Sequence, residues 1–190
     1  MPVPAQQPRY TYADYLTWGE DEHIEIINGD AVMMSPPSRI HQKIVMEISR
    51  QIANFLEGKK CEVYPAPFGV RLFAEEDDLP DDIDTIVEPD ITVVCDHDKL
   101  DKDGCKGAPN MVIEVLSPST QRHDRLVKLD LYSRAGVPEY WIVSPEDQTV
   151  QVFLLKDDHY IVSEVYTAKD IAKVNTLDGC FVELSKVFSE

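Results

Sequence analysis

The sequence predicts a mixed α/β fold, bordering on α+β, in which one mixed β-sheet is flanked by helices and preceded by a β-hairpin. Three observations support this. An Asn-Gly pair separates two short apolar runs near the N-terminus, an apolar stripe at helical spacing follows, and two apolar runs at 88–94 and 110–116 precede a second helical pattern. Strands and helices in this order are typical of a sheet covered by helices. We expect residues 10–190 to form a single domain, and residues 1–9, with three prolines, to form a flexible tail.

The first element is a hairpin predicted over residues 23–34. Asn28 and Gly29 tolerate the positive φ angles of a type I′ turn, whose twist matches that of the flanking strands. Side chains alternate along a strand, so Glu25 lies on the face opposite its two isoleucine neighbours. If the isoleucines face the core, Glu25 faces solvent; the alternative is that Glu25 is a third acid near a functional site.

The long helix that follows is predicted to begin with Ser35 as its N-cap and Pro36 at its first helical position, and to end before Gly58. Its apolar stripe comprises Ile40, Ile44, Val45, Ile48, Ile52, Phe55 and Leu56. His41 lies beside this stripe. It is interpreted either as a capping or packing residue or as a ligand, because histidine serves both roles.

Further strands and a second helix complete the predicted fold. The strands are predicted at 60–74 (interrupted), 87–95, 110–116, 138–144, 150–155 and 160–166, with a short strand and a last turn in 170–190. An acidic loop at 75–86 and a flexible loop at 96–109 connect them. The second helix is predicted to begin near Thr120 and to end at Gly136, with Leu126, Leu129 and Tyr132 as its apolar face.

The charge balance is strongly acidic. The formal net charge is −17, from 18 basic and 35 acidic residues. Seven of the acids fall within residues 75–84, where such a run is typical of a solvated loop. Affinity for phosphates comes from clustered lysine and arginine, so this balance disfavours tight, non-specific DNA binding by the chain alone.

The sequence also indicates where in the cell the protein is expected to be found. It contains no stretch of about 18 apolar residues, so we expect no membrane span. The N-terminus lacks the basic and apolar regions of a secretory signal, and we expect a cytoplasmic protein. No two cysteines have C-x-x-C spacing, which predicts free thiols. The cysteines are Cys61, Cys95, Cys105 and Cys180.

Two acids within the apolar runs are the strongest candidates for chemistry. Pro89 cannot donate a hydrogen bond to a neighbouring strand, which sets Asp90 near the start of its strand. Glu114 shares a strand face with apolar neighbours, where a carboxylate is costly unless it is paired, protonated or bound to a metal. Two acids on strands, with Lys128 close behind on a helix, can hold a divalent cation and activate a water.

The alternative for these acids is a purely structural role. Asp90 would then pair with an arginine and Glu114 with Lys128, since ion-pair networks also bury acids. The functional interpretation depends on three features that coincide: a Pro-Asp pair at a strand start, an acid inside an apolar strand, and a lysine on the next helix.

Six motifs in order carry a resemblance to a known family. They are 24–30, 35–38 with His41, 88–91, 112–120, Asp124 with Lys128, and 136–143. Together they resemble the PD-(D/E)XK, or restriction-endonuclease-like, superfamily, and more closely the bacterial Uma-type restriction endonucleases, formerly a domain of unknown function. The superfamily expects a lysine two residues after the second acid, where this chain has Leu116. The resemblance implies that Lys128 takes the place of that lysine.

The resemblance implies a restriction-endonuclease-like core with an added N-terminal hairpin, and a metal-dependent endonuclease activity. Asp90, Glu114 and the carbonyl of Val115 would bind Mg²⁺ or Mn²⁺, which prefer hard oxygen ligands. Asp90 and Glu114 would be catalytic together with Lys128, which would orient the attacking water or stabilise developing charge. The accessory residues would be Glu25, His41 and Asp124.

The expected reaction is hydrolysis of phosphodiester bonds, with DNA as the favoured substrate despite the charge of −17. One alternative is a catalytically inactive nuclease-fold module for binding or assembly, which the acidic surface favours. A weaker alternative is a metal-dependent hydrolase of another phosphodiester. A homodimer is expected from the prevalence of two-fold assemblies and from the resemblance, and a protein partner could bring the chain to DNA. No membrane partner is expected.

Overall fold

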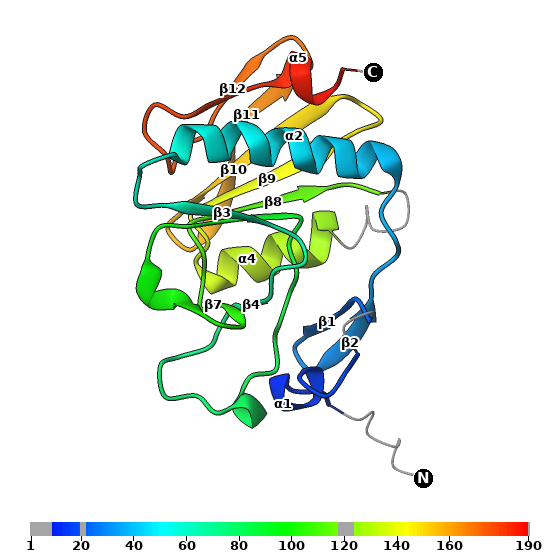
Figure 1. The fold of residues 1–190 in the computed structure, drawn as a ribbon, viewed down its shortest axis with the longest axis vertical. Helices are drawn as coiled ribbons and strands as arrows, with labels where there is room; N and C mark the ends of the chain where they lie inside the picture. Colours follow the sequence, from blue (N-terminus) through cyan, green and yellow to red (C-terminus); the bar gives the residue numbers. More distant parts are fainter. Residues whose placement is uncertain (1–8, 20–21, 118–123, 190) are drawn as a thin grey trace.

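The computed structural model describes residues 9–19, 22–117 and 124–189, with the backbone alone for residues 124 and 125. The strands of its central sheet are β3 (Glu62–Pro65), β5 (Ile91–Val94), β8 (Met111–Val115), β9 (Glu139–Ser144), β10 (Thr149–Lys156) and β11 (His159–Thr167). Their order is β11-β10-β9-β8-β5-β3 (Figure 1). β8 and β9 run parallel, and the other neighbours in this sheet are antiparallel. The predicted mixed sheet is confirmed.

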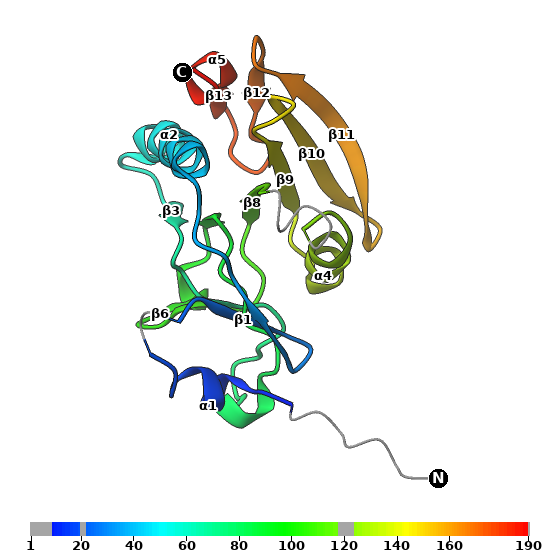
Figure 2. The same cartoon turned by 90° about the vertical axis from the view of Figure 1, so that its right-hand side faces the viewer.

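Helices cover both faces of the sheet (Figure 2). On one face lie α2 (Arg39–Leu56) and the short α5 (Leu184–Val187), which follows the hairpin of β12 (Ile171–Lys173) and β13 (Phe181–Glu183). On the other face lies α4 (Leu129–Ala135). Each helix buries an apolar side against the strands, which fixes its position. None of the described helices is both long enough and apolar enough to cross a bilayer.

The start of α2 differs from the prediction. Its N-cap is Ser38, whose hydroxyl accepts a hydrogen bond from the backbone N–H of His41 at 3.2 Å. Ser35 and Pro36 lie before the helix. Pro36 is followed directly by Pro37. The ring of a proline disfavours the helical conformation in the residue before it, so Pro36 is a poor first residue for the helix.

The second helix has an unexpected buried side. A π-helical turn over Asp124–Lys128 leads into α4, and Gly136 ends the helix in the left-handed conformation (φ 82°), as predicted. The predicted apolar face is right for Tyr132, which is fully buried, and for Leu129, which packs against the core, but wrong for Leu126, which is 62% exposed; the fully buried Lys128 was not part of it. The wider π turn shifts the side chains relative to an α-helical count. The predicted start near Thr120 lies outside the described residues.

The N-terminal hairpin is confirmed as β1 (Ile24–Ile27) and β2 (Asp30–Met33). An antiparallel bridge between Ile26 and Ile86 attaches β1 to the segment that leads into β5. The short α1 (Tyr12–Tyr15) packs beside it in a small apolar cluster. The hairpin is therefore held against the start of the strand that carries Asp90.

The loop predicted at 96–109 contains regular structure. β6 (Leu100–Asp101) and β7 (Gly104–Lys106) form a three-stranded sheet with β4 (Val70–Arg71), and a short 3₁₀ turn occupies His97–Lys99. Another short 3₁₀ turn, Pro80–Asp82, lies in the predicted acidic loop. A Cβ on Gly104, whose φ is +131°, would lie 2.1 Å from the Gly69 carbonyl oxygen. Only glycine fits this close approach. Sequence analysis missed β6 and β7 because strands of two or three residues are too short to show a periodic pattern.

The prediction of four free cysteines is wrong for one pair. Cys61 and Cys95 form a disulfide, while Cys105 and Cys180 are free and buried. β3 pairs with β5 in a register that joins Glu62 to Val94, so the cysteines that flank these residues meet as the next pair. Their separation of 34 residues gave no local signal.

Candidate functional site

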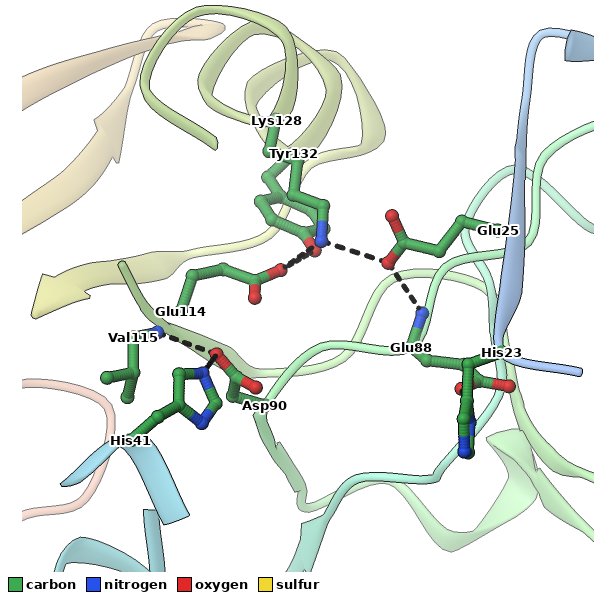
Figure 3. Close-up of polar contacts among 9 residues, drawn as sticks. All are labelled: His23, Glu25, His41, Glu88, Asp90, Glu114, Val115, Lys128 and Tyr132. Carbon is green, nitrogen blue, oxygen red and sulfur yellow. Dashed lines mark hydrogen bonds and ion pairs between the residues drawn. The ribbon is translucent and has the colours of Figure 1, made fainter. Parts of the chain in front are cut away.

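The two candidate acids meet where β5 and β8 lie side by side. The register pairs Ile91 with Ile113 and Thr92 with Val112. Continued by one residue, it sets Asp90 opposite Glu114, and directly opposed side chains of antiparallel strands are in contact range. Glu114 points toward Lys128 and Tyr132, at the start of α4, whereas the carboxylate of Asp90 lies beside His41 of α2 (Figure 3).

The carboxylate of Asp90 is held in position by two groups. Its Oδ2 accepts a hydrogen bond from the backbone N–H of Val115 at 2.7 Å and lies 3.1 Å from Nε2 of His41. Burial lowers the pKa of His41, but the hydrogen bond to Asp90 and its negative charge outweigh burial and raise the pKa above its ordinary value. Asp90 thus has a histidine partner instead of the arginine considered from the sequence.

Glu114 is almost fully buried and has an ion-pair partner. Its Oε1 accepts hydrogen bonds from Nζ of Lys128 at 2.8 Å and from the hydroxyl of Tyr132 at 2.7 Å. Burial, together with the charge of Glu114, raises the pKa of Tyr132 well above its usual value, so the phenol stays protonated and donates. The ion pair considered from the sequence, between Glu114 and Lys128, is present.

Glu25 belongs to the same network, and the expectation that it faces solvent is wrong. The residue is fully buried, and its Oε1 accepts hydrogen bonds from Nζ of Lys128 and from the backbone N–H of Glu88, both at 2.9 Å. Its Oε2 has no hydrogen-bond partner among the described residues. The hairpin lies against the strand entrance, so the face of β1 that carries Glu25 is covered as well.

Lys128 is a bridge between the hairpin and the sheet. Its side chain is 0% exposed and lies between the carboxylates of Glu25 and Glu114 (Figure 3). The side chain of Asp124, expected to hold Lys128, lies outside the described residues.

A pocket of about 350 Å³ opens beside the two acids. Glu88, Asp90 and Glu114 line it together with His23 and His41. Apolar side chains and prolines form another part of its wall: Met34, Pro36, Pro37, Val45, Ala66 and Pro67. Lys128 is absent from the described residues that line the pocket, and it is linked to the pocket residue Glu114 by its ion pair.

Sequence analysis assigned no role in the site to Glu88, to its partners Tyr15 and His23, or to Tyr132. Glu88 lines the pocket and accepts a hydrogen bond from the Tyr15 hydroxyl at 2.5 Å; its second oxygen lies 3.8 Å from Nδ1 of His23. Tyr132 contacts Glu114 from one helical turn beyond Lys128. Two spacings in the sequence could have identified these residues. Glu88 is two residues before Asp90, a spacing that puts side chains on the same face of a strand, and Tyr132 is four residues after Lys128, a spacing that puts side chains on the same face of a helix.

The donor chemistry fits a small divalent cation. Asp90 and Glu114 supply carboxylate oxygens to one pocket. Continuing the strand register sets Pro89 opposite Val115, and Pro89 has no N–H to donate to the Val115 carbonyl. Within the described residues no group of three or more His, Cys, Asp or Glu side chains could hold a metal, so the candidate set is two carboxylates and one carbonyl. Mg²⁺ is commonly bound by one or two carboxylates, with water or substrate completing its shell.

The fold and comparisons with known proteins define the class of protein. The mixed sheet flanked by helices matches a crystal structure from Anabaena variabilis described as a "putative nuclease belonging to DUF820", with a TM-score of 0.73, 19% identity, and coverage of 95% of this chain and 98% of the other. Residues 12–185 match the Uma2 family, described as "Putative restriction endonuclease". The chain belongs to this family.

A relative from Synechocystis sp. is similar over most of its length. It is named "Uncharacterized protein slr1290" and is 26% identical over 177 residues, which cover 92% of this chain and 89% of the relative. The resemblance inferred from the six sequence motifs is therefore confirmed at the level of family and fold.

Proposed function

We propose that this protein is a metal-dependent nuclease that hydrolyses phosphodiester bonds, with DNA as its substrate. The observation that carries the proposal is the meeting of Asp90 and Glu114 in one pocket, each acid held by its own partners. Membership of a family described as restriction endonucleases and the nuclease-like fold support the same reaction class.

Asp90, Glu114 and the carbonyl of Val115 would hold Mg²⁺ or Mn²⁺. Such an ion, when bound, lowers the pKa of a water and neutralises charge on the phosphate. The chain's own residues prepare the carboxylates. His41 and the N–H of Val115 hold Asp90 in one orientation, so that little reorganisation is needed when a ligand arrives.

Lys128 is a positioning residue in this proposal. Its ammonium is enclosed by Glu25 and Glu114, so it neutralises part of their charge and fixes Glu114 at the pocket wall. Tyr132 donates to the same oxygen of Glu114 and leaves the carboxylate one fixed rotamer. In this proposal Lys128 acts through Glu114, whereas the sequence-based expectation, which stays a prediction, was that Lys128 itself orients the attacking water or stabilises developing charge.

A catalytically inactive binding module is the second candidate. The net charge of −17 favours it, because an acidic surface repels a polyphosphate. A lysine already engaged by two carboxylates also favours it, since a lysine that touched the phosphate would have to be released from them.

A cleavage assay with matched variants separates the two candidates. The purified protein is incubated with labelled DNA in Mg²⁺, in Mn²⁺, and in EDTA. We expect cleavage with either ion, none in EDTA, and none with Asp90→Asn or Glu114→Gln. Asp98→Asn is a control in an exposed 3₁₀ turn and should cleave as the parent does. Cleavage that survives in both site variants would come from a contaminant and would favour the inactive module.

A further inference from the structure

The disulfide between Cys61 and Cys95 fastens a strand at the edge of the central sheet. β3 is the last strand in the sheet order, so β5 is its one neighbour among the described strands of this sheet. The ladder that joins β3 to β5 has four residue pairs, and one of them contains Pro65, which has no N–H to donate. The disulfide joins the residues at the other end of this short ladder. It is therefore a large part of what holds β3 in place.

The bonded cysteines are open to solvent in a way that the free cysteines are not. Cys61 and Cys95 are both partly exposed, whereas Cys105 and Cys180 are buried. Burial raises the pKa of each free thiol to about 11, so both remain protonated. Thiol–disulfide exchange begins with a thiolate, which must also reach the sulfur that it attacks. The attacking thiol therefore has to come from outside the chain, and the bonded pair is where it can act.

β3 leads directly into the wall of the pocket. Ala66 and Pro67 follow the last residue of β3, and both line the pocket. The backbone N–H of Ala66 donates a hydrogen bond to the carbonyl oxygen of Asp90 at 3.0 Å. Both wall residues are exposed, so packing against the core contributes little to their position. The position of β3 therefore affects the wall and the backbone of a candidate metal ligand together.

We propose that the Cys61–Cys95 disulfide is an exchange site for a dithiol reductant, and that its reduction loosens β3 and the Ala66–Pro67 wall of the pocket. A thiolate of the dithiol attacks one sulfur of the pair, breaks the S–S bond and forms a mixed disulfide. The second thiolate of the dithiol then attacks the mixed disulfide and releases the protein sulfur. The dithiol is oxidised to its own disulfide, and its two electrons and two protons end on Cys61 and Cys95 as thiols. This inference does not depend on the proposed nuclease function.

The first test reduces the folded protein with dithiothreitol well below its unfolding temperature, alkylates the thiols and locates them by mass spectrometry. We expect alkylation at Cys61 and Cys95 and at neither Cys105 nor Cys180. The disulfide closes a loop with a sequence separation of 34 residues, so its reduction should lower the Tm by roughly 10 °C. The matched control is the double variant Cys61→Ser/Cys95→Ser. It should unfold near the Tm of the reduced protein and should not respond to dithiothreitol.

The second test measures where the reduced protein opens, by amide hydrogen exchange. Residues 60–68, which contain β3 and the wall, should exchange at least about tenfold faster after reduction, because amides at a sheet edge exchange through local opening. β11, at the opposite edge of the same sheet, is the internal control and should exchange at an unchanged rate.

Two results would overturn the inference. A pair that dithiothreitol cannot reduce in the folded protein is not an exchange site. Reduction that leaves the Tm and the exchange of residues 60–68 unchanged would show that β3 and the wall are held without the disulfide. Neither measurement involves cleavage, so the proposed nuclease function is tested separately.

Discussion

Two buried glutamates on neighbouring parallel strands have opposite surroundings. Glu139, on β9, is fully buried and accepts hydrogen bonds from neutral donors: Nε1 of Trp141 at 2.8 Å and the backbone N–H groups of Asn175 and Thr176 at 3.0 and 2.7 Å. Glu114, on β8, faces a lysine, a tyrosine and a pocket. An acid inside an apolar strand therefore does not by itself indicate a site. A countercharge and an opening to the surface distinguish Glu114.

The largest effect on stability is expected from Lys128→Met. The substitution leaves the carboxylates of Glu25 and Glu114 buried without the charge that they share, and breaking a buried pair in this way costs about 3–5 kcal/mol. Urea unfolding measures the loss. Lys102→Met, at a side chain that is 90% exposed, should change the free energy of unfolding by less than about 0.5 kcal/mol. Equal losses for the two variants would show that the network is not intact in solution.

Glu114→Gln should abolish activity while preserving the fold. Glutamine keeps the shape of the side chain but removes the charge that a metal needs. Loss of a candidate ligand should exceed the 10- to 100-fold loss typical of outer-shell partners, so we expect a fall of more than about 100-fold in the cleavage rate. Calorimetric titration with Mn²⁺ should show weakened binding in parallel. A variant that keeps its affinity for Mn²⁺ would remove Glu114 from the ligand set.

Glu139→Gln should lower the stability of the fold and leave the cleavage activity unchanged, the reverse of what is expected for Glu114→Gln. The amide group of glutamine cannot accept all the hydrogen bonds that the carboxylate of Glu139 accepts, and an unsatisfied buried group costs about 1–3 kcal/mol. We expect that loss in thermal or urea unfolding, with cleavage per folded molecule unchanged. Loss of cleavage without loss of stability would place Glu139 in the site and end the contrast with Glu114.

The smallest effect is expected from Tyr132→Phe. It removes one donor from Glu114, and a hydrogen bond to a charged group contributes about 1.5–3 kcal/mol. We expect a fall of about 10-fold or more in cleavage, as for other residues that orient a metal ligand. Tyr160→Phe is the matched control, because its hydroxyl donates to the Val137 carbonyl at 2.8 Å, away from the acids. A similar fall in both variants would indicate a general packing effect.

The fold was largely predictable because its signals are local. The Asn-Gly turn identified the hairpin, the isoleucine stripe identified α2, and the apolar runs identified β5 and β8. The two acids were identified because each departs from the apolar pattern of its run; that the two segments lie side by side is shown by the strand register. What was missed depends on tertiary contacts: the Cys61–Cys95 pair needs the strand register.

The site was predictable only in part, for a similar reason. Asp90 and Glu114 break the pattern of their strands, so they are visible in the sequence. Glu25 follows the alternating pattern of an exposed strand face, and nothing local reveals that this face is covered. Lys128 is a fully buried lysine on a helix, and the π-helical turn that rotates it inward has no sequence signature of its own.

The bond between Lys128 and Glu25 joins residues 103 positions apart in the sequence. During synthesis the hairpin with Glu25 leaves the ribosome early, whereas Lys128 follows only after both candidate ligand strands. Until then the carboxylates of Glu25 and Glu114 lack their shared cation and remain hydrated, which opposes closure of the hairpin over the strand entrance. The order of translation thus delays completion of the Glu25–Lys128–Glu114 network until both strands that lead from the candidate acids have been made.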